Sequence, residues 1–140
     1  DGGSWAASFE LGGKEDREYV VLVDGREVAR RPGTARRITF SPDGSRTAWL
    51  EKKDKLWRVV VDGQEGPQYR KIFRNEPLQF SPDGRDVVYF TQNKDTTMSI
   101  AVFDGPERTH DVVIPWARFT EQGITYLAID GTRLRRWVLE

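Results

Sequence analysis

The chain has 140 residues, of which 37% are hydrophobic and 11% aromatic, and its 22 basic and 22 acidic side chains cancel at neutral pH. Balanced charge argues against a dedicated nucleic-acid binder, because such proteins gain much of their affinity by neutralising phosphates. The absence of cysteine excludes disulfides and a thiolate nucleophile, and no apolar run approaches the roughly 20 residues that insert across a bilayer.

The first predicted unit covers approximately residues 1–37. Its opening, "DGGSWAASFE", fits the second half of a strand–turn–strand motif that recurs later in the chain. "YVVLVDG" at residues 19–25 follows as an apolar run that ends in an Asp-Gly turn, and "REVAR" is expected to form a short further strand.

The second predicted unit, residues 38–77, carries the clearest motif. "ITF" is a strand that ends at Phe40, and in the following "SPDG" Pro presets the backbone for a turn while Gly accepts positive φ. "RTAWLE" and "LWRVVV" are the next two strands, joined by the polar tip "EKKDK". "VDG" makes another turn, and "PQYRKIF" is expected to form a weaker fourth strand.

The remaining two units, residues 78–116 and 117–140, repeat this pattern. "LQFSPDGRDVVYFT" follows "ITFSPDGSRTAWLE" at a distance of 40 residues, and "SIAVFDG" follows "WRVVVDG" at 42. "ARFTEQGITYLAI" is a degraded third copy in which Phe119 and Gly123 keep their places, and the chain ends on the strand "LRRWVLE". No segment shows the apolar periodicity of a helix.

We label the strands of one period a, b, c and d, so that "SPDG" joins a to b and "VDG" joins c to d. The chain then contains b-c-d, a-b-c-d, a-b-c-d and a-b-c. Repeated four-stranded antiparallel units of about 40 residues are typical of propeller blades. The prediction is an all-β propeller segment of about four blades, with the first and last incomplete.

The "FSPDG…AWLE…VVVDG" and "FSPDG…VYF…VFDG" runs resemble the WD-like repeats of TolB-type bacterial β-propellers, over essentially the whole chain. This resemblance implies a non-catalytic scaffold that contacts other proteins, in the periplasm or outside the cell, although it leaves the cytoplasm open. One alternative is a propeller segment of a larger enzyme, such as a prolyl-oligopeptidase-type peptidase whose catalytic domain lies elsewhere. A second is a purely structural subunit of a larger complex.

An arc of blades would leave an apolar sheet face at each end, and natural proteins seldom expose such faces. We expect the arc to be part of a longer chain, or to be completed by a second copy or another partner. A compact β-sandwich is the remaining alternative.

Catalytic and metal-binding groups are sparse. The single histidine, His110, stands beside Asp111 as a base beside an orienting acid would, but an exposed turn or edge histidine is the favoured interpretation. The candidate calcium ligands are five of the aspartates that precede glycine, and their intervals are too long for one calcium loop, so we interpret them as turn residues and expect neither metal nor cofactor; they are Asp24, Asp43, Asp62, Asp83 and Asp104.

Periodic aromatic residues are expected to pack between blades, because they recur at the same place in each period. They are Phe40, Phe80 and Phe119 on strand a, and Trp49 and Tyr89 on strand b. Trp116 and Trp137 do not fit the period. For each of them a position in the core and a position on a contact surface are both possible interpretations.

Strand alternation predicts which end of the propeller binds a partner. All "SPDG" and "VDG" turns must lie at one end, and the more varied b–c tips and d–a connections at the other. Arginine and tryptophan are enriched among residues that dominate protein interfaces, and four arginines crowd "ARRPGTARR". The predicted contact residues for an acidic protein partner are Arg31, Arg36, Arg37, Lys52, Lys53, Arg74 and Trp116.

Overall fold

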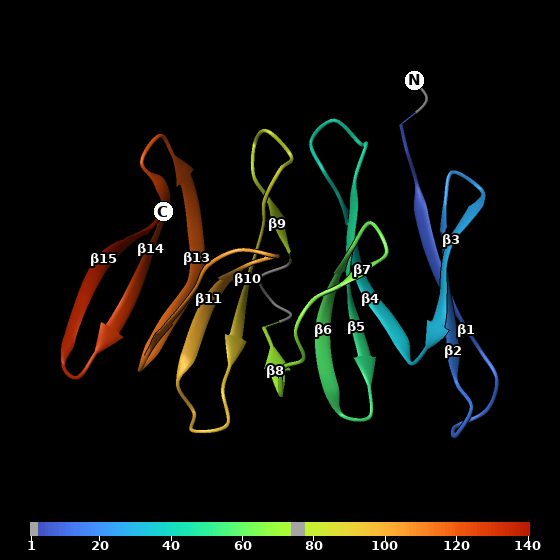
Figure 1. Cartoon of the computed structure of the whole chain (residues 1–140), viewed down its shortest axis with the longest axis horizontal. Helices are drawn as coiled ribbons and strands as arrows, with labels where there is room; N and C mark the ends of the chain where they lie inside the picture. The colour runs from blue at the N-terminus through green and yellow to red at the C-terminus, as the bar shows by residue number, and fades with distance from the viewer. Residues whose placement is uncertain (1–2, 74–77) are drawn as a thin grey trace.

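The computed structural model describes residues 3–73 and 78–140, and all regular structure in these residues is β-strand. The strands form four antiparallel sheets that stand in a row in chain order (Figure 1). The all-β, blade-like architecture expected from the sequence is thereby confirmed. Within the described residues there is no helix long and apolar enough to cross a membrane.

The first sheet has three strands and the second has four, as the sequence predicts. The first sheet is formed by β1 (Ala6–Leu11), β2 (Glu18–Val23) and β3 (Arg26–Pro32). The second is formed by β4 (Thr34–Phe40), β5 (Thr47–Lys53), β6 (Leu56–Val61) and β7 (Gln64–Glu65).

In the third sheet, strand a consists of two short segments, and both pair with strand b. The sheet is formed by β8 (Lys71–Ile72), β9 (Gln79–Phe80), β10 (Val87–Gln92), β11 (Met98–Val102) and β12 (Glu107–His110). The fourth is formed by β13 (Val112–Thr120), β14 (Gly123–Asp130) and β15 (Arg133–Leu139). Because the last three predicted units begin near the end of strand a, the second, third and fourth sheets start a few residues before their units.

The prediction for "PQYRKIF" is wrong in part. The outer strand of the second sheet is β7, extended by a bridge in which the backbone N–H and C=O groups of Tyr69 pair with those of Trp57. Lys71 and Ile72 instead pair with β10 in the third sheet. Ile72 is buried in the core between these two sheets, and this burial favours its place on the inner strand of the next blade.

The "SPDG" turns have the geometry expected from their sequence. The Gly44 N–H donates to the Ser41 carbonyl at 2.9 Å, and Gly44 has a φ of 73°. The Ser41 hydroxyl donates to Asp43 Oδ1 at 2.6 Å, and this bond, with two further bonds from Ser45, lowers the pKa of Asp43 to about 2. Asp43 therefore acts as a turn residue, as expected.

The "VDG" turns also put their aspartates in the left-handed region, which the sequence analysis assigned only to glycine. Asp24 and Asp62 both have a φ of 50°. Their carboxylates bind the start of the neighbouring strand b: Asp24 Oδ1 accepts from the Trp5 N–H, and Asp62 Oδ1 from the Thr47 N–H, both at 2.9 Å. These bonds hold the a–b and c–d turns at the same end of each blade.

Replacing Gly84 by valine is expected to lower the free energy of unfolding by about 1–3 kcal/mol, because valine at positive φ is strained. A β-carbon at Gly84, whose φ is 72°, would lie 3.3 Å from Ser41 Cβ, whereas a β-carbon at Gly44 would lie 3.6 Å from Ser4 Oγ. We therefore expect Gly44→Val to be the milder change. Urea unfolding followed by circular dichroism measures both. Gly3→Val, in open space, is the control, and equal stability of all three variants would contradict the role of these turns.

The core consists of three clusters, one between each pair of neighbouring sheets. Trp49 and Tyr89 are buried in the first and second of these, as expected from their period. Trp137 packs against the cluster between the third and fourth sheets, whereas Trp116 is 49% exposed. The two aperiodic tryptophans thus have different environments.

Candidate functional site

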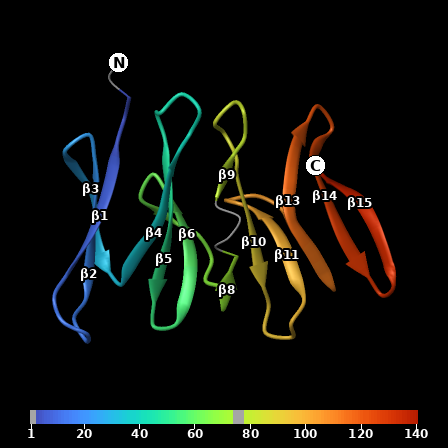
Figure 2. The same cartoon turned by 180° about the vertical axis from the view of Figure 1, so that it is seen from behind.

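The hairpin tips lie at one end of the row of sheets, opposite the "SPDG" turns. Figure 2 shows the β1–β2, β5–β6 and β10–β11 tips along the lower edge and the β4–β5 and β9–β10 turns along the upper edge. These tips are among the varied segments expected at this end, and the described residues of the tips lie there.

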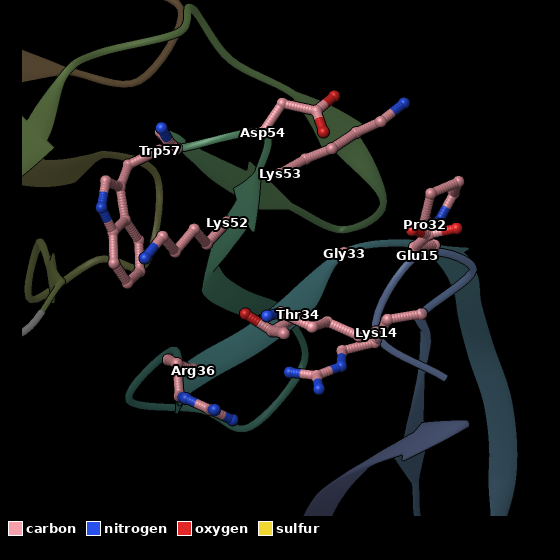
Figure 3. A pocket seen from close by; sticks show the side chains of 12 residues that line it. Lys14, Glu15, Pro32, Gly33, Thr34, Arg36, Lys52, Lys53, Asp54 and Trp57 are labelled. Atoms are coloured by element: carbon pink, nitrogen blue, oxygen red, sulfur yellow. The ribbon is translucent and has the colours of Figure 1, made fainter. Parts of the chain in front are cut away.

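A groove of about 570 Å³ opens at the tip end, between the first and second sheets (Figure 3). Three segments build it: the β1–β2 tip, the β3–β4 connection and the β5–β6 tip. The residues that line it are Lys14, Glu15, Arg17, Pro32, Gly33, Thr34, Arg36, Lys52, Lys53, Asp54, Lys55 and Trp57. We call this feature the tip groove.

Glycine at position 33 lets the three segments approach one another. Gly33 has a φ of 112°, and a β-carbon there would lie 2.4 Å from the carbonyl oxygen of Lys52. Its N–H donates to the Arg17 carbonyl at 2.9 Å, which fixes the β1–β2 tip beside the β3–β4 connection. Asp54 and Lys55, both at positive φ, form the tight turn that presents the neighbouring lysines.

The groove carries positive charge that the surrounding residues do not neutralise. Glu10 pairs with both arginines of the lining, Arg17 at 3.4 Å and Arg36 at 2.9 Å. No described residue forms an ion pair with any of the four lysines, which are Lys14, Lys52, Lys53 and Lys55.

Trp57 gives the tip groove an apolar wall. Lys52 Nζ lies 5.3 Å from the centroid of the Trp57 ring, within the range of a cation–π interaction (Figure 3). Chemically, the groove offers ammonium groups to anionic oxygens and one aromatic face to an apolar side chain.

The structure brings only part of the predicted contact set together. Arg36, Lys52 and Lys53 line the tip groove, and Arg37 is exposed at a β-bulge of β4 with a φ of 57°. Trp116 lies on the fourth sheet, away from this groove. Arg74 lies outside the described residues. Sequence reasoning did not select Lys14, Lys55 or Trp57, because only the pairing of the sheets brings their segments to one groove.

Arg31 is engaged inside the molecule. Its Nε donates to Glu51 Oε1 at 2.7 Å, and its guanidinium also pairs with Glu65. Glu51 is only 2% exposed; it accepts a further hydrogen bond from the Tyr19 hydroxyl at 2.7 Å and forms an ion pair with Arg58, whose Nε lies 2.9 Å from Oε2. Burial raises the pKa of Tyr19, so this phenol remains a neutral donor. The Glu51 network thus joins the first sheet to the second.

His110 is buried, which corrects the expectation of an exposed histidine. It is 5% exposed, with Nδ1 2.8 Å from Asp130 Oδ2 and Nε2 2.8 Å from the Tyr126 hydroxyl. The bond from His110 lowers the pKa of Asp130. Asp111, the orienting acid considered from the sequence, instead accepts from the Gly131 N–H at 2.6 Å. Since Tyr126 and Asp130 belong to β14, these bonds link the third sheet to the fourth.

The acidic turn residues do not gather. Among residues 3–73 and 78–140, no group of three or more histidine, aspartate or glutamate side chains is placed to hold a metal ion.

Comparison with known proteins identifies the fold. No protein-family model and no curated protein matches the sequence. Among solved structures, the β-propeller domain of the Trilobed protease from Pyrococcus furiosus, described as having an open velcro topology, is similar with a TM-score of 0.58 and 15% identity. The match covers 96% of this chain and 54% of that one, so the chain spans about half of that structure's length. The chain therefore has the architecture of a β-propeller segment.

Proposed function

We propose that this propeller segment is a non-catalytic protein-interaction module of TolB-like repeats, and that its tip groove binds a carboxylate-rich segment of a protein partner. The observation that carries the proposal is the set of four lysines around the groove that pair with no described acid. Lysines placed this way attract an acidic chain during encounter and lose their effect as salt is added.

A protein partner fits the groove better than a nucleic acid does. Glu15 and Asp54 stand among the lysines, and the chain as a whole has no net charge, whereas nucleic-acid binders present an extended basic surface. The Trp57 ring adds an apolar surface of the kind that anchors protein interfaces. An acidic segment with an occasional apolar side chain matches both features.

Charge reversal in the groove tests this proposal. We expect Lys52→Glu together with Lys53→Glu to weaken binding of a fluorescently labelled peptide of mixed Asp, Glu and Leu by about tenfold, equal to ~1.4 kcal/mol for two surface contacts. Fluorescence anisotropy measures the affinity, and the unmodified chain should bind more weakly as the salt concentration rises.

The matched control reverses the same charge at the tip end of the neighbouring third sheet, outside the tip groove. Lys71 and Lys94 line a separate hollow beside the β10–β11 tip, and Lys71→Glu with Lys94→Glu should leave the affinity almost unchanged. Equal weakening in both double variants would show that the peptide responds only to net charge. Failure of the unmodified chain to bind any acidic peptide would refute the proposed function.

The alternative function is that of a propeller segment in a larger peptidase, with the catalytic groups on another part of the protein. The similar structure is the propeller domain of a protease, which is compatible with this alternative and supports only the propeller fold. A periplasmic or extracellular location belongs to the first proposal and rests on the resemblance to TolB-type repeats alone.

A further inference from the structure

Exposed large apolar side chains are concentrated on the two end sheets. Among the described residues, all but one of these side chains belong to the first sheet, to the segment just before it, or to the fourth sheet. The exception is Leu56 at the β5–β6 tip. The set comprises Trp5, Phe9, Leu11, Val28, Leu56, Val112, Ile114, Trp116 and Leu134. Contiguous exposed apolar surface on a sheet usually marks a contact with another molecule.

In the first sheet, strand register places these side chains on the outward face. Tyr19 and Val21 of β2 pack toward the second sheet. Phe9 pairs with Val20, and Leu11 pairs with Glu18. Because side chains alternate along β2, Val20 and Glu18 lie on the opposite face from Tyr19 and Val21, and Phe9 and Leu11 lie there with them. Phe9 and Leu11 are 45% and 43% exposed there.

The fourth sheet has the corresponding arrangement. Tyr126 and Ala128 of β14 pack toward the third sheet. Ile129 pairs with Val112 on one side and with Leu134 on the other, and these three side chains share the outward face. Leu134, at 59%, is the most exposed large apolar residue that the structure describes.

The two outward faces are complementary in kind. In the second sheet, Leu50 of strand b packs toward the following sheet and Trp49 toward the preceding one. By the same alternation, the outward face of the fourth sheet corresponds to the face of the second sheet that packs on the following blade. The outward face of the first sheet corresponds to the face of the second sheet that packs on the preceding blade. A contact between the two is head-to-tail, and such contacts form a ring when the rotation closes.

Charges on the two faces are also opposite. Glu18, paired with Leu11, lies on the outward face of the first sheet, where Glu27 and Arg30 also lie and form an ion pair with each other, so this face keeps a net negative charge. Arg118, paired with Thr125, and Arg136, paired with Leu127, lie on the outward face of the fourth. Opposite charges around apolar patches favour contact between the two different faces over contact between two identical ones.

We propose that two copies of this chain close one propeller ring, with the fourth sheet of each copy packed on the first sheet of the other. The size of the similar propeller structure supports a second copy as the occupant, because this chain covers about half of it. Two equivalent head-to-tail contacts related by a twofold axis would cover all four outward faces.

Solution mass tests the proposal. Sedimentation velocity and light scattering should give twice the mass of one chain, across a wide range of protein concentration. Phe9→Glu on the first sheet and Leu134→Glu on the fourth should each abolish the dimer while leaving the circular dichroism spectrum unchanged. Ile114→Lys, also on the outward face of the fourth sheet, replaces Leu134→Glu if that variant does not fold. Leu56→Glu makes the same leucine-to-glutamate substitution at an exposed position of a middle sheet, and this variant should keep the dimer.

A mixing experiment distinguishes the head-to-tail arrangement from others. The Phe9→Glu chain keeps its fourth-sheet face and the Leu134→Glu chain keeps its first-sheet face, so an equimolar mixture should recover a dimer with one intact contact. A monomeric unmodified chain would overturn the proposal, and so would a Leu134→Glu variant that stays dimeric alone. Growth into filaments would show that the contact does not close, which also overturns it.

Discussion

Replacing Glu51 by alanine is expected to lower the free energy of unfolding by about 3–5 kcal/mol, the usual cost of removing one partner from a buried ion pair. The carboxylate is 2% exposed and binds Arg31 and Arg58 as well as the Tyr19 hydroxyl. Without it, two guanidinium groups lose their common buried partner and the phenol loses its acceptor. Urea unfolding followed by tryptophan fluorescence measures the change.

Two further variants separate charge from packing. Glu51→Gln keeps a hydrogen-bond acceptor for Tyr19 and should fall between the alanine variant and the unmodified chain. Glu51→Leu combined with Arg31→Met and Arg58→Met removes all three charges of this ion-pair network. We expect this triple variant to recover most of the stability that Glu51→Ala loses. If Glu51→Ala unfolds at the same urea concentration as the unmodified chain, the Glu51 network does not stabilise the contact between the first and second sheets.

Replacing Trp49 by alanine should have an effect of similar size, about 3–5 kcal/mol, because it deletes a large buried side chain from a packed core. Trp49 is fully buried against the first sheet, and its indole N–H donates to the Tyr19 hydroxyl at 3.0 Å. Circular dichroism during urea unfolding measures this change without depending on the removed fluorophore.

The same substitution at an exposed tryptophan is the control. Trp5 is 50% exposed, so Trp5→Ala should change stability by no more than about 0.5 kcal/mol, as surface substitutions usually do. Similar stabilities for the two alanine variants would contradict the interpretation of periodic aromatics as core residues.

The strand order and the turns could be predicted because their signals are local. Pro of "SPDG" fixes its own backbone and Gly accepts positive φ, and a buried strand such as β11 is apolar at every position except Ser99. Interactions between sheets could not be predicted in this way. His110 meets Tyr126 and Asp130 only because the third and fourth sheets pack face to face, and nothing in the residues next to His110 indicates that contact.

The tip groove shows the same division. The b–c tips, "EKKDK" among them, were expected at one end of the molecule, and Lys52 and Lys53 were selected from this segment. Their relation to Lys14 depends on the close passage at Gly33, a tertiary feature. Arg31 stands in the same arginine-rich segment as Arg36, yet its position on β3 directs it to the buried Glu51, and composition alone cannot distinguish the two.

The sheets stand in a row, and the main contacts between them join each sheet to its neighbours in that row (Figure 1). Within a single chain, opening an end sheet therefore breaks one apolar layer, whereas opening a middle sheet breaks two, and in a monomeric variant local stability should fall from the middle of the row towards both ends. The stacking order is also the order of synthesis. As the chain leaves the ribosome, each new sheet emerges beside the one it packs against, which keeps unpaired apolar faces short-lived during folding.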